Sequence, residues 1–208
     1  MQGAISNPAE RHPVADEVRD LLDRAYLEFN RPGFIEDDPI SIPHRFSRKE
    51  DIEIAGFFAS LLAWGNRKTI IRNSLRLIDW MDNAPYEFIM NFKEKDLIPF
   101  TRFVHRTFNG DDCIFFLNSL QNIYSCHEGL EHVFCWHTKG MEVREAIISF
   151  RKVFFERPHL SRSEKHIANP AKNASAKRIN MFLRWMVRKD EKGVDFGIWR
   201  KLKPAMLM

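Results

Sequence analysis

The sequence predicts an all-α protein, a compact multi-helix array that forms a single helical domain over residues 1–208. Apolar residues recur at helical spacing through most of the chain. No segment shows the alternation of apolar and polar residues that marks a half-buried strand. Hydrophobic residues make up 44% of the chain and include 18 Phe, enough for a large aromatic core. We expect about eight or nine helices, with ends uncertain by a few residues.

The N-terminal part is expected to hold one helix, a loop and a second helix. Residues 14–29 place apolar side chains at helical spacing after Pro13, a residue common at the first helical position. Residues 30–46 contain three prolines and a glycine, which predict an ordered loop. Ser47 and Glu50 have the spacing of a capping box, so Ser47 is expected to cap the second helix.

The later helices follow from caps, glycines and apolar spacing. Gly65 is expected to end the second helix. We expect the remaining helices from Asn66 or Thr69, from Pro85, from Asp111 or Asp112 to Tyr124, from Leu130 to Trp136, from Met141 to Phe155 and from Ser175 to Arg188. Asp195 is a candidate cap for a short helix whose Trp199 packs on the core.

Composition excludes several classes of protein. Charged residues make up 29% of the chain, and no stretch approaches the ~20 apolar residues of a membrane-spanning helix. The N-terminus has neither the basic nor the apolar region of an export signal. We therefore expect a cytoplasmic protein with no membrane partner.

Metal and cofactor chemistry has weak support. Three cysteines are too few for a disulfide framework or for the four thiolates of an iron–sulfur cluster. Thiols and imidazoles do gather in one short span, at Cys126, His127, His132, Cys135 and His137. Their spacing matches no established zinc pattern, so core cysteines and surface histidines are the better interpretation. We expect no metal and no cofactor.

Positive charge is concentrated near the C-terminus. The formal net charge is only +4, yet residues 157–189 carry nine lysines and arginines against one carboxylate, Glu164. Such a segment is a candidate phosphate-binding surface. On charge alone, a solvated basic face with no partner is an equally good interpretation.

One candidate site lies where this basic segment enters the last helix. Lys172, Asn173 and Ser175 precede the helix, whose free backbone N–H groups attract anions. Asn173 or Ser175 is also a candidate for an ordinary N-cap. Lys177 follows in the first turn beside Arg178, where neighbouring positive charge disfavours an ammonium, so it is a candidate amine nucleophile. Most lysines in first turns are plain surface residues.

A second candidate site lies at the junction of two helices. Trp64, Asn66, Arg67 and Lys68 surround Gly65 and offer stacking, hydrogen-bonding and phosphate-contacting groups together. A core tryptophan followed by a C-cap glycine explains the same residues equally well.

Three stretches together resemble an uncharacterised bacterial protein family. They are Asp38–Phe46, Asp51–Arg67, and Lys177–Arg188 followed by Val194–Trp199. That family is in turn remotely similar to the helix-hairpin-helix DNA glycosylases, nearest to the archaeal 8-oxoguanine DNA glycosylases. The resemblance spans nearly the whole chain and implies the helical fold of those enzymes.

The resemblance implies a role for Lys177. In those enzymes a lysine at a helix start attacks C1′ of a flipped nucleotide, and a later aspartate stabilises the developing positive charge. Lys177 matches the lysine, and the turn at Asn66 and Arg67 lies roughly where glycosylases contact the lesion. The family's Pro-Leu-Asp stretch, which would supply the aspartate, has no match before Met208. We therefore expect a chain truncated at its C-terminus, with doubtful full activity.

Three hypotheses follow. The first is a monomeric base-excision repair glycosylase, with or without lyase activity, that acts on oxidised or abasic duplex DNA. Its nucleophile is Lys177, and its DNA-binding residues are Lys172, Asn173, Ser175, Arg178, Arg184, Trp64, Asn66, Arg67 and Lys68. The second hypothesis is a nucleic-acid-binding module without catalysis. The third is a helical scaffold in which the basic charge is incidental.

Overall fold

A computed structural model describes residues 13–135, 142–189 and 191–204. Eight α-helices and one very short hairpin lie in these ranges, which confirms the predicted all-α class. The helices are α1 (Pro13–Phe29), α2 (Lys49–Leu62), α3 (Arg67–Trp80), α4 (Pro85–Asn91), α5 (Gly110–Cys126), α6 (Leu130–Cys135), α7 (Val143–Phe154) and α8 (Lys177–Val187). In these ranges no helix combines the length and apolarity that crossing a bilayer requires.

Short 3-10 turns and one hairpin connect the helices. The turns are η1 (Pro32–Phe34), η2 (Pro39–Ser41), η3 (Pro43–Arg45), η4 (Glu94–Leu97), η5 (Pro99–Arg102), η6 (Ser161–His166) and η7 (Pro170–Lys172). Strands β1 (Val104–His105) and β2 (Phe108–Asn109) pair antiparallel, with Val104 opposite Asn109. The sequence did not predict them, because two residues are too few to show alternation.

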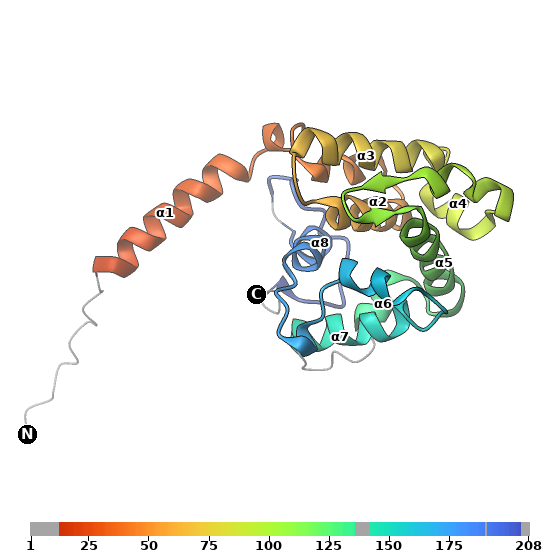
Figure 1. The fold of residues 1–208 in the computed structure, drawn as a ribbon. Coiled ribbons are helices and arrows are strands. Elements are labelled where there is room, and N and C mark those ends of the chain that lie inside the picture. The colour runs from red at the N-terminus through yellow and green to blue at the C-terminus, as the bar shows by residue number, and fades with distance from the viewer. Residues whose placement is uncertain (1–12, 136–141, 190, 205–208) are drawn as a thin grey trace, which may run out of the picture.

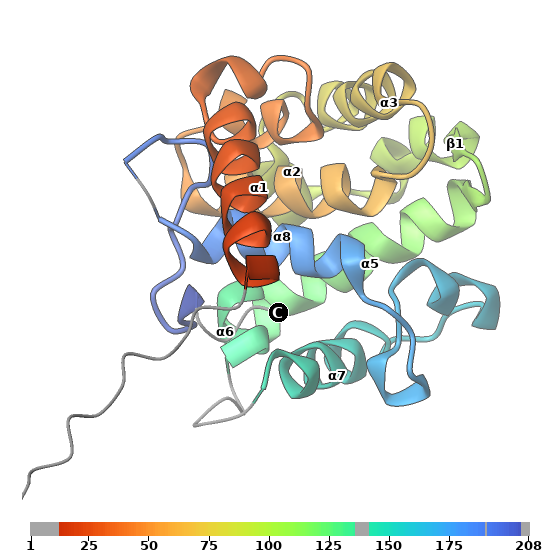
Figure 2. The same cartoon turned by 90° about the vertical axis from the view of Figure 1, so that its left-hand side faces the viewer.

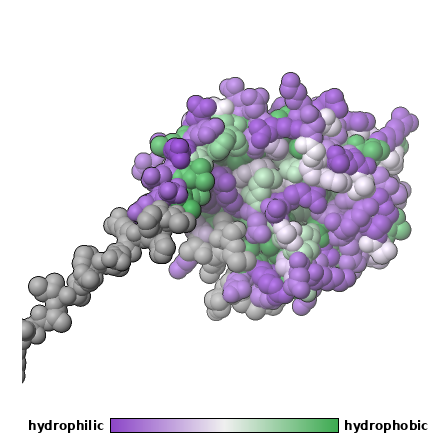
Figure 3. Space-filling model, turned by 60° about the vertical axis from the view of Figure 1, so that its left-hand side comes forward, coloured by the Kyte–Doolittle hydropathy of each residue, from purple (hydrophilic) through white to green (hydrophobic). Residues whose placement is uncertain are grey.

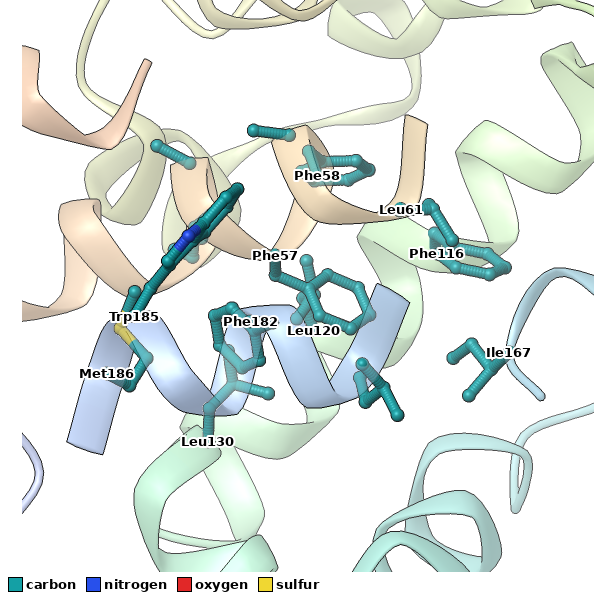
Figure 4. Close-up of a cluster of buried hydrophobic side chains, with 14 of the residues drawn as sticks. Phe57, Phe58, Leu61, Phe116, Leu120, Leu130, Ile167, Phe182, Trp185 and Met186 are labelled. Carbon is teal, nitrogen blue, oxygen red and sulfur yellow. The ribbon is translucent and has the colours of Figure 1, made fainter. Parts of the chain in front are cut away.

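The core forms around the contact between α2 and α8. Figure 2 shows α8 running beneath α2, with α6 and α7 on its other side. In the close-up, Phe57 of α2 faces Phe182 of α8 (Figure 4), and the ring centroids are 5.8 Å apart. Gly56 permits the close approach, since a Cβ there would lie 2.9 Å from the methyl carbon of Met186.

Helix α1 lies apart from this core. It extends away from the body formed by the other helices (Figure 1). Its apolar side chains are exposed, including Leu22 at 63% and Phe29 at 51%. Figure 3 shows apolar side chains at the surface on the side where the N-terminal segment leaves the body. The predicted helix is confirmed; most of its apolar face is exposed, while Phe29 packs edge-on against Phe34 of η1, with ring centroids 6.0 Å apart.

The caps of α2 and α5 differ from the sequence predictions. Arg48, not Ser47, is the N-cap of α2, and no side chain caps that helix end. Glu50 instead accepts a hydrogen bond from Arg48 at 3.2 Å. The cap of α5 is Asn109, which forms a capping box with Asp112. Asp112 is therefore the third helical residue rather than the cap.

The predictions around α8 also need correction. The N-cap of α8 is Ala176, without a side-chain hydrogen bond, so Ser175 does not cap this helix. Asn173 has a φ of 57° and ends η7, a conformation that asparagine tolerates better than most residues. The segment around Asp195 and Trp199 forms no helix; its backbone runs along the end of α8, with Trp199 N donating to Met186 O at 2.9 Å.

Candidate functional site

The end of α2 and the start of α8 bring the two predicted clusters together. Because these helices run antiparallel, Arg178 lies beside the last turn of α2. Its guanidinium donates hydrogen bonds to the carbonyl oxygens of Leu61 and, at 3.2 Å, His166. The guanidinium carbon is 5.7 Å from the ring centroid of Trp64. The start of α8 and the turn after α2, far apart in sequence, thus contact each other through Arg178 and Trp64.

Trp64 lies between two guanidinium groups. Arg106, in the turn between β1 and β2, places its guanidinium carbon 4.6 Å from the centre of the Trp64 ring. Gly65 adopts a φ of +113°, and a Cβ there would lie 3.0 Å from Arg106 Nη1. The half-buried indole therefore takes part in cation–π contacts with both arginines. The sequence analysis missed Arg106, because only the fold brings the hairpin to this turn.

Arg178 is committed to the protein interior. Burial lowers the pKa of its guanidinium, and the carbonyl groups at the end of α2 compensate, since a helix C-terminus favours a cation. As a predicted DNA-binding residue, Arg178 therefore has little freedom to reach a phosphate. It fixes the start of α8 against α2 instead.

Arg184 is also paired within the protein. Its Nε donates to Asp195 Oδ2 at 3.1 Å, and Arg188 bonds the same oxygen. Burial raises the pKa of Asp38, while the charges of Arg67 and Arg184 oppose that shift. Arg67 and Arg184 thus approach one carboxylate from α3 and α8.

Three lysines of the predicted site remain unpaired. Lys68, Lys172 and Lys177 are exposed, and none forms an ion pair with another residue that the structure describes. Asn66 is exposed at the start of α3, where its side chain caps the helix by accepting from Thr69 N at 3.2 Å. Asn66 was one of the two predicted starts of this helix. Capping uses only its side-chain oxygen, so the amide nitrogen of the exposed side chain takes no part in the cap.

Lys177 borders two hollows on either side of the α8 N-terminus. One, of about 120 Å³, lies toward α2 and is lined by Ser60, Leu61, His166 and Arg178 among others. Figure 4 shows Leu61 and Ile167, two of its apolar residues, beyond the end of α8 distant from Met186. The other, of about 390 Å³, lies toward α7 and η7, and its size is in the range of ligand pockets. Lys177 and Ser175 line both.

A buried polar network supports the smaller hollow. Asp112 is fully buried and accepts hydrogen bonds from Ser163 Oγ at 2.6 Å and Arg162 Nη1 at 2.7 Å. His166 Nε2 lies 3.1 Å from Asp112 Oδ2. Burial alone would raise the pKa of Asp112, but the hydrogen bonds and the charges of His166 and Arg162 hold it below its usual range. The sequence did not predict this network, because Asp112 lies in α5 and His166 in η6, and only the fold brings them together.

The histidine of this network is held neutral. Burial lowers the pKa of His166, and the nearby Asp112 carboxylate opposes that shift. His166 is 4% exposed, and its ring lies edge-on to Phe108 at 5.0 Å. A neutral imidazole with one nitrogen on a carboxylate leaves its other nitrogen as a proton acceptor.

The thiols and imidazoles between Cys126 and His137 do not converge on a metal site. His127 pairs with Glu156 at 3.0 Å and His132 with Glu128 at 2.9 Å. Across the described ranges no group of three His, Cys, Asp or Glu residues could hold a metal ion; His137 lies outside those ranges. Cys126 is exposed, so the expectation of a core cysteine was wrong there, whereas Cys135 is half-buried and packs against the core.

Comparison with known proteins gives one finding. A family model described as a protein of unknown function (DUF2400) matches residues 38–208. No curated protein and no solved structure matches the chain. The matched region contains α2 through α8, and therefore both predicted clusters, whereas α1 precedes it.

Proposed function

The chain belongs to this family of unknown function, and we propose that it is a DNA-binding base-excision glycosylase, with Lys177 as its amine nucleophile. One observation carries the proposal. Lys177 is exposed, forms no ion pair with another described residue and lines two hollows, and its neighbour Arg178 contacts the Trp64 ring. The resemblance of the Lys177 stretch to glycosylase sequences supports the same role. We place the protein in the cytoplasm, acting on duplex DNA as a monomer without a cofactor.

The proposed reaction begins with extrusion of a damaged nucleotide. Flipping exposes C1′, which the stacked duplex hides. The Lys177 amine, once deprotonated, attacks C1′, and the departing base takes the electron pair of the broken C1′–N bond. Opening of the sugar ring then gives a Schiff base between Lys177 and C1′, which is the intermediate of a lyase step.

DNA binding would draw on the unpaired cations and on Trp64. Lys68 and Lys172 are exposed and form no ion pair with another described residue, and Arg67 is exposed at the start of α3; all three suit phosphate oxygens. A displaced base would stack on the half-buried indole of Trp64 by replacing the guanidinium of Arg106, which lies 4.6 Å from the ring centre. Binding should therefore weaken steeply with salt, because each neutralised phosphate releases counterions.

Borohydride trapping tests the nucleophile. We expect the wild-type chain to form a covalent complex with duplex DNA that holds an abasic site or 8-oxoguanine, since borohydride reduces a Schiff base to a stable amine. Lys177→Ala should abolish the complex while leaving duplex affinity within about threefold, because other cations supply most phosphate contacts.

Lys152→Ala is the matched control. Lys152 is an exposed lysine of α7 that lines neither hollow, so its loss should leave trapping unchanged. Trapping by the Lys177→Ala variant at the wild-type level would remove Lys177 from the mechanism. Absence of trapping by the wild type on both duplexes would reject glycosylase chemistry for this chain.

A binding module without catalysis is the second candidate. It is favoured by the absence, among residues the structure describes, of a carboxylate paired with Lys177. Such a module would bind lesion-bearing and plain duplexes equally and with the same salt dependence. A preference of tenfold or more for the lesion would argue against it. A third candidate, a protein scaffold, is favoured by the exposed apolar side chains of α1, and it predicts no DNA binding even at low salt.

A further inference from the structure

The smaller hollow beside Lys177 holds a second group suited to proton transfer. We propose that His166, oriented by Asp112, is the general base that takes the proton of Lys177. This inference rests on the proposed function and names the residue that performs a step the reaction requires. It assigns the task to a histidine and a buried aspartate of this chain, neither of which the sequence motifs identify.

The first argument is position. His166 and Lys177 line the same hollow of about 120 Å³, which has room for about four water molecules. Proton transfer between the two side chains would pass through water in this shared hollow. Their backbones are tied together as well, since Arg178, the neighbour of Lys177, donates to the carbonyl oxygen of His166 at 3.2 Å.

The second argument is orientation. Asp112 Oδ2 lies 3.1 Å from His166 Nε2, so that nitrogen carries the proton and Nδ1 keeps a lone pair. In the described part of the chain nothing forms a hydrogen bond with Nδ1. Ser163 and Arg162 donate hydrogen bonds to the Asp112 carboxylate and hold it in place. The carboxylate in turn holds the His166 ring. Asp112 is thus a positioning residue in this scheme.

The proton balance is complete. The Lys177 ammonium gives one proton to His166 Nδ1, and the freed lone pair forms the bond to C1′. The electron pair of the C1′–N bond leaves with the base. The imidazolium, stabilised by the Asp112 carboxylate, then returns its proton to the departing base nitrogen, so His166 ends neutral.

Several charged groups surround His166 and determine its titration. Asp112 of α5 favours the imidazolium, while Arg162 and Lys165 of η6 disfavour it. Arg178 of α8 contacts its backbone carbonyl. Burial is the largest influence and favours the neutral ring. The base form should therefore prevail at neutral pH, which is the form the proposal needs.

The test is the pH profile of single-turnover trapping on an abasic duplex, from pH 5.5 to 9.5. For the wild type we expect the rate to rise as His166 loses its proton and to level off by about pH 7. His166→Gln should lower the rate at pH 7 by about 100-fold or more. Its rate should continue to rise up to pH 9.5, because the amine must then lose its proton to solvent.

His159→Gln is the matched control, since it makes the same substitution at a histidine that lines neither hollow and bonds the carbonyl oxygen of Arg157 instead. It should keep the wild-type profile, which separates proton transfer by His166 from loss of an imidazole elsewhere. Asp112→Asn should retain trapping but move the profile toward that of His166→Gln.

Each outcome decides the proposal. A folded His166→Gln variant with the wild-type rate and profile would overturn it. If that variant fails to fold, the wild-type profile is sufficient, because a rate that keeps rising to pH 9.5 without levelling would also overturn it. These results are distinct from failure of the proposed function, in which the wild type itself traps no DNA at any pH.

Discussion

At the scale of single residues, Glu53 is a carboxyl group with a strongly raised pKa. Its side chain is buried in α2, where Oε1 accepts from Trp199 Nε1 at 2.6 Å and Oε2 from Tyr124 Oη at 2.7 Å. Lys49 Nζ lies 3.8 Å away. Burial raises the pKa of Glu53 from 4.5 to about 7 despite these partners. The carboxylate therefore links α2, α5 and the C-terminal segment at a cost in solvation.

This cost predicts a pH dependence of stability. Because the pKa of Glu53 is higher in the folded state, its contribution to stability is fully present below pH 4.5 and is lost as pH rises through about 7. Glu53→Gln should remove that dependence, so the difference between wild type and variant should change by on the order of 3 kcal/mol across this window. Urea unfolding at several pH values measures it.

Glu50→Gln provides the comparison, since Glu50 lies one turn earlier and pairs with Arg48 near the surface. The unfolding free energy of Glu50→Gln should change with pH in the same way as that of the wild type. If the Glu53→Gln curve also runs parallel, the carboxyl group of Glu53 has an ordinary pKa and is more solvated than its burial indicates.

Single residues also show which parts of the candidate site could be predicted from the sequence. The basic segment 157–189 was evident in the sequence, but the structure divides it by residue type. Its arginines bond inside the protein, as Arg162 does with Asp112 and Arg184 with Asp195. Lysines such as Lys172 and Lys177 stay exposed. A guanidinium can satisfy several buried acceptors at once, whereas an ammonium is strongly hydrated. Sequence alone counts both as positive charge.

At the scale of elements, helices could be predicted well and their caps poorly. Apolar spacing placed α7 and α8 within a few residues of their ends, because burial of one face depends only on local order. Capping depends on the direction from which the preceding chain arrives. The approach to α5 comes from a hairpin, which places Asn109 rather than Asp111 or Asp112 at the cap.

The start of α5 also offers a sharp test of packing. Gly110 touches η5, and a Cβ there would lie 2.1 Å from the carbonyl oxygen of Thr101. Gly110→Ala should therefore push η5 away and lower the free energy of unfolding by roughly 1–3 kcal/mol. Gly33→Ala should be nearly neutral, since nothing lies within 4 Å of its Cβ position. Thermal or urea unfolding compares them, and equal stability of the two variants would mean that η5 is not held against α5.

At the scale of the whole molecule, the body begins after α1. Asn30 is buried and accepts a hydrogen bond from Arg188 Nη2 at 2.6 Å, which ties the start of the body to the end of α8. Helix α1 has an apolar stripe like those of the buried helices, so its sequence could not show that it lies outside the core. Amphipathic spacing predicts a helix with a face to bury but does not name what covers that face.

Deleting residues 1–28 tests this division. The deletion removes side chains that are exposed in the structure, such as Leu21 and Leu27, so the free energy of unfolding should change by less than about 0.5 kcal/mol. Leu183→Ala, which empties a fully buried position in α8, should cost about 2–5 kcal/mol in the same assay. A loss of comparable size on deletion would show that α1 folds back onto the body in solution and buries its apolar face there. An unchanged stability would leave that face available to another molecule.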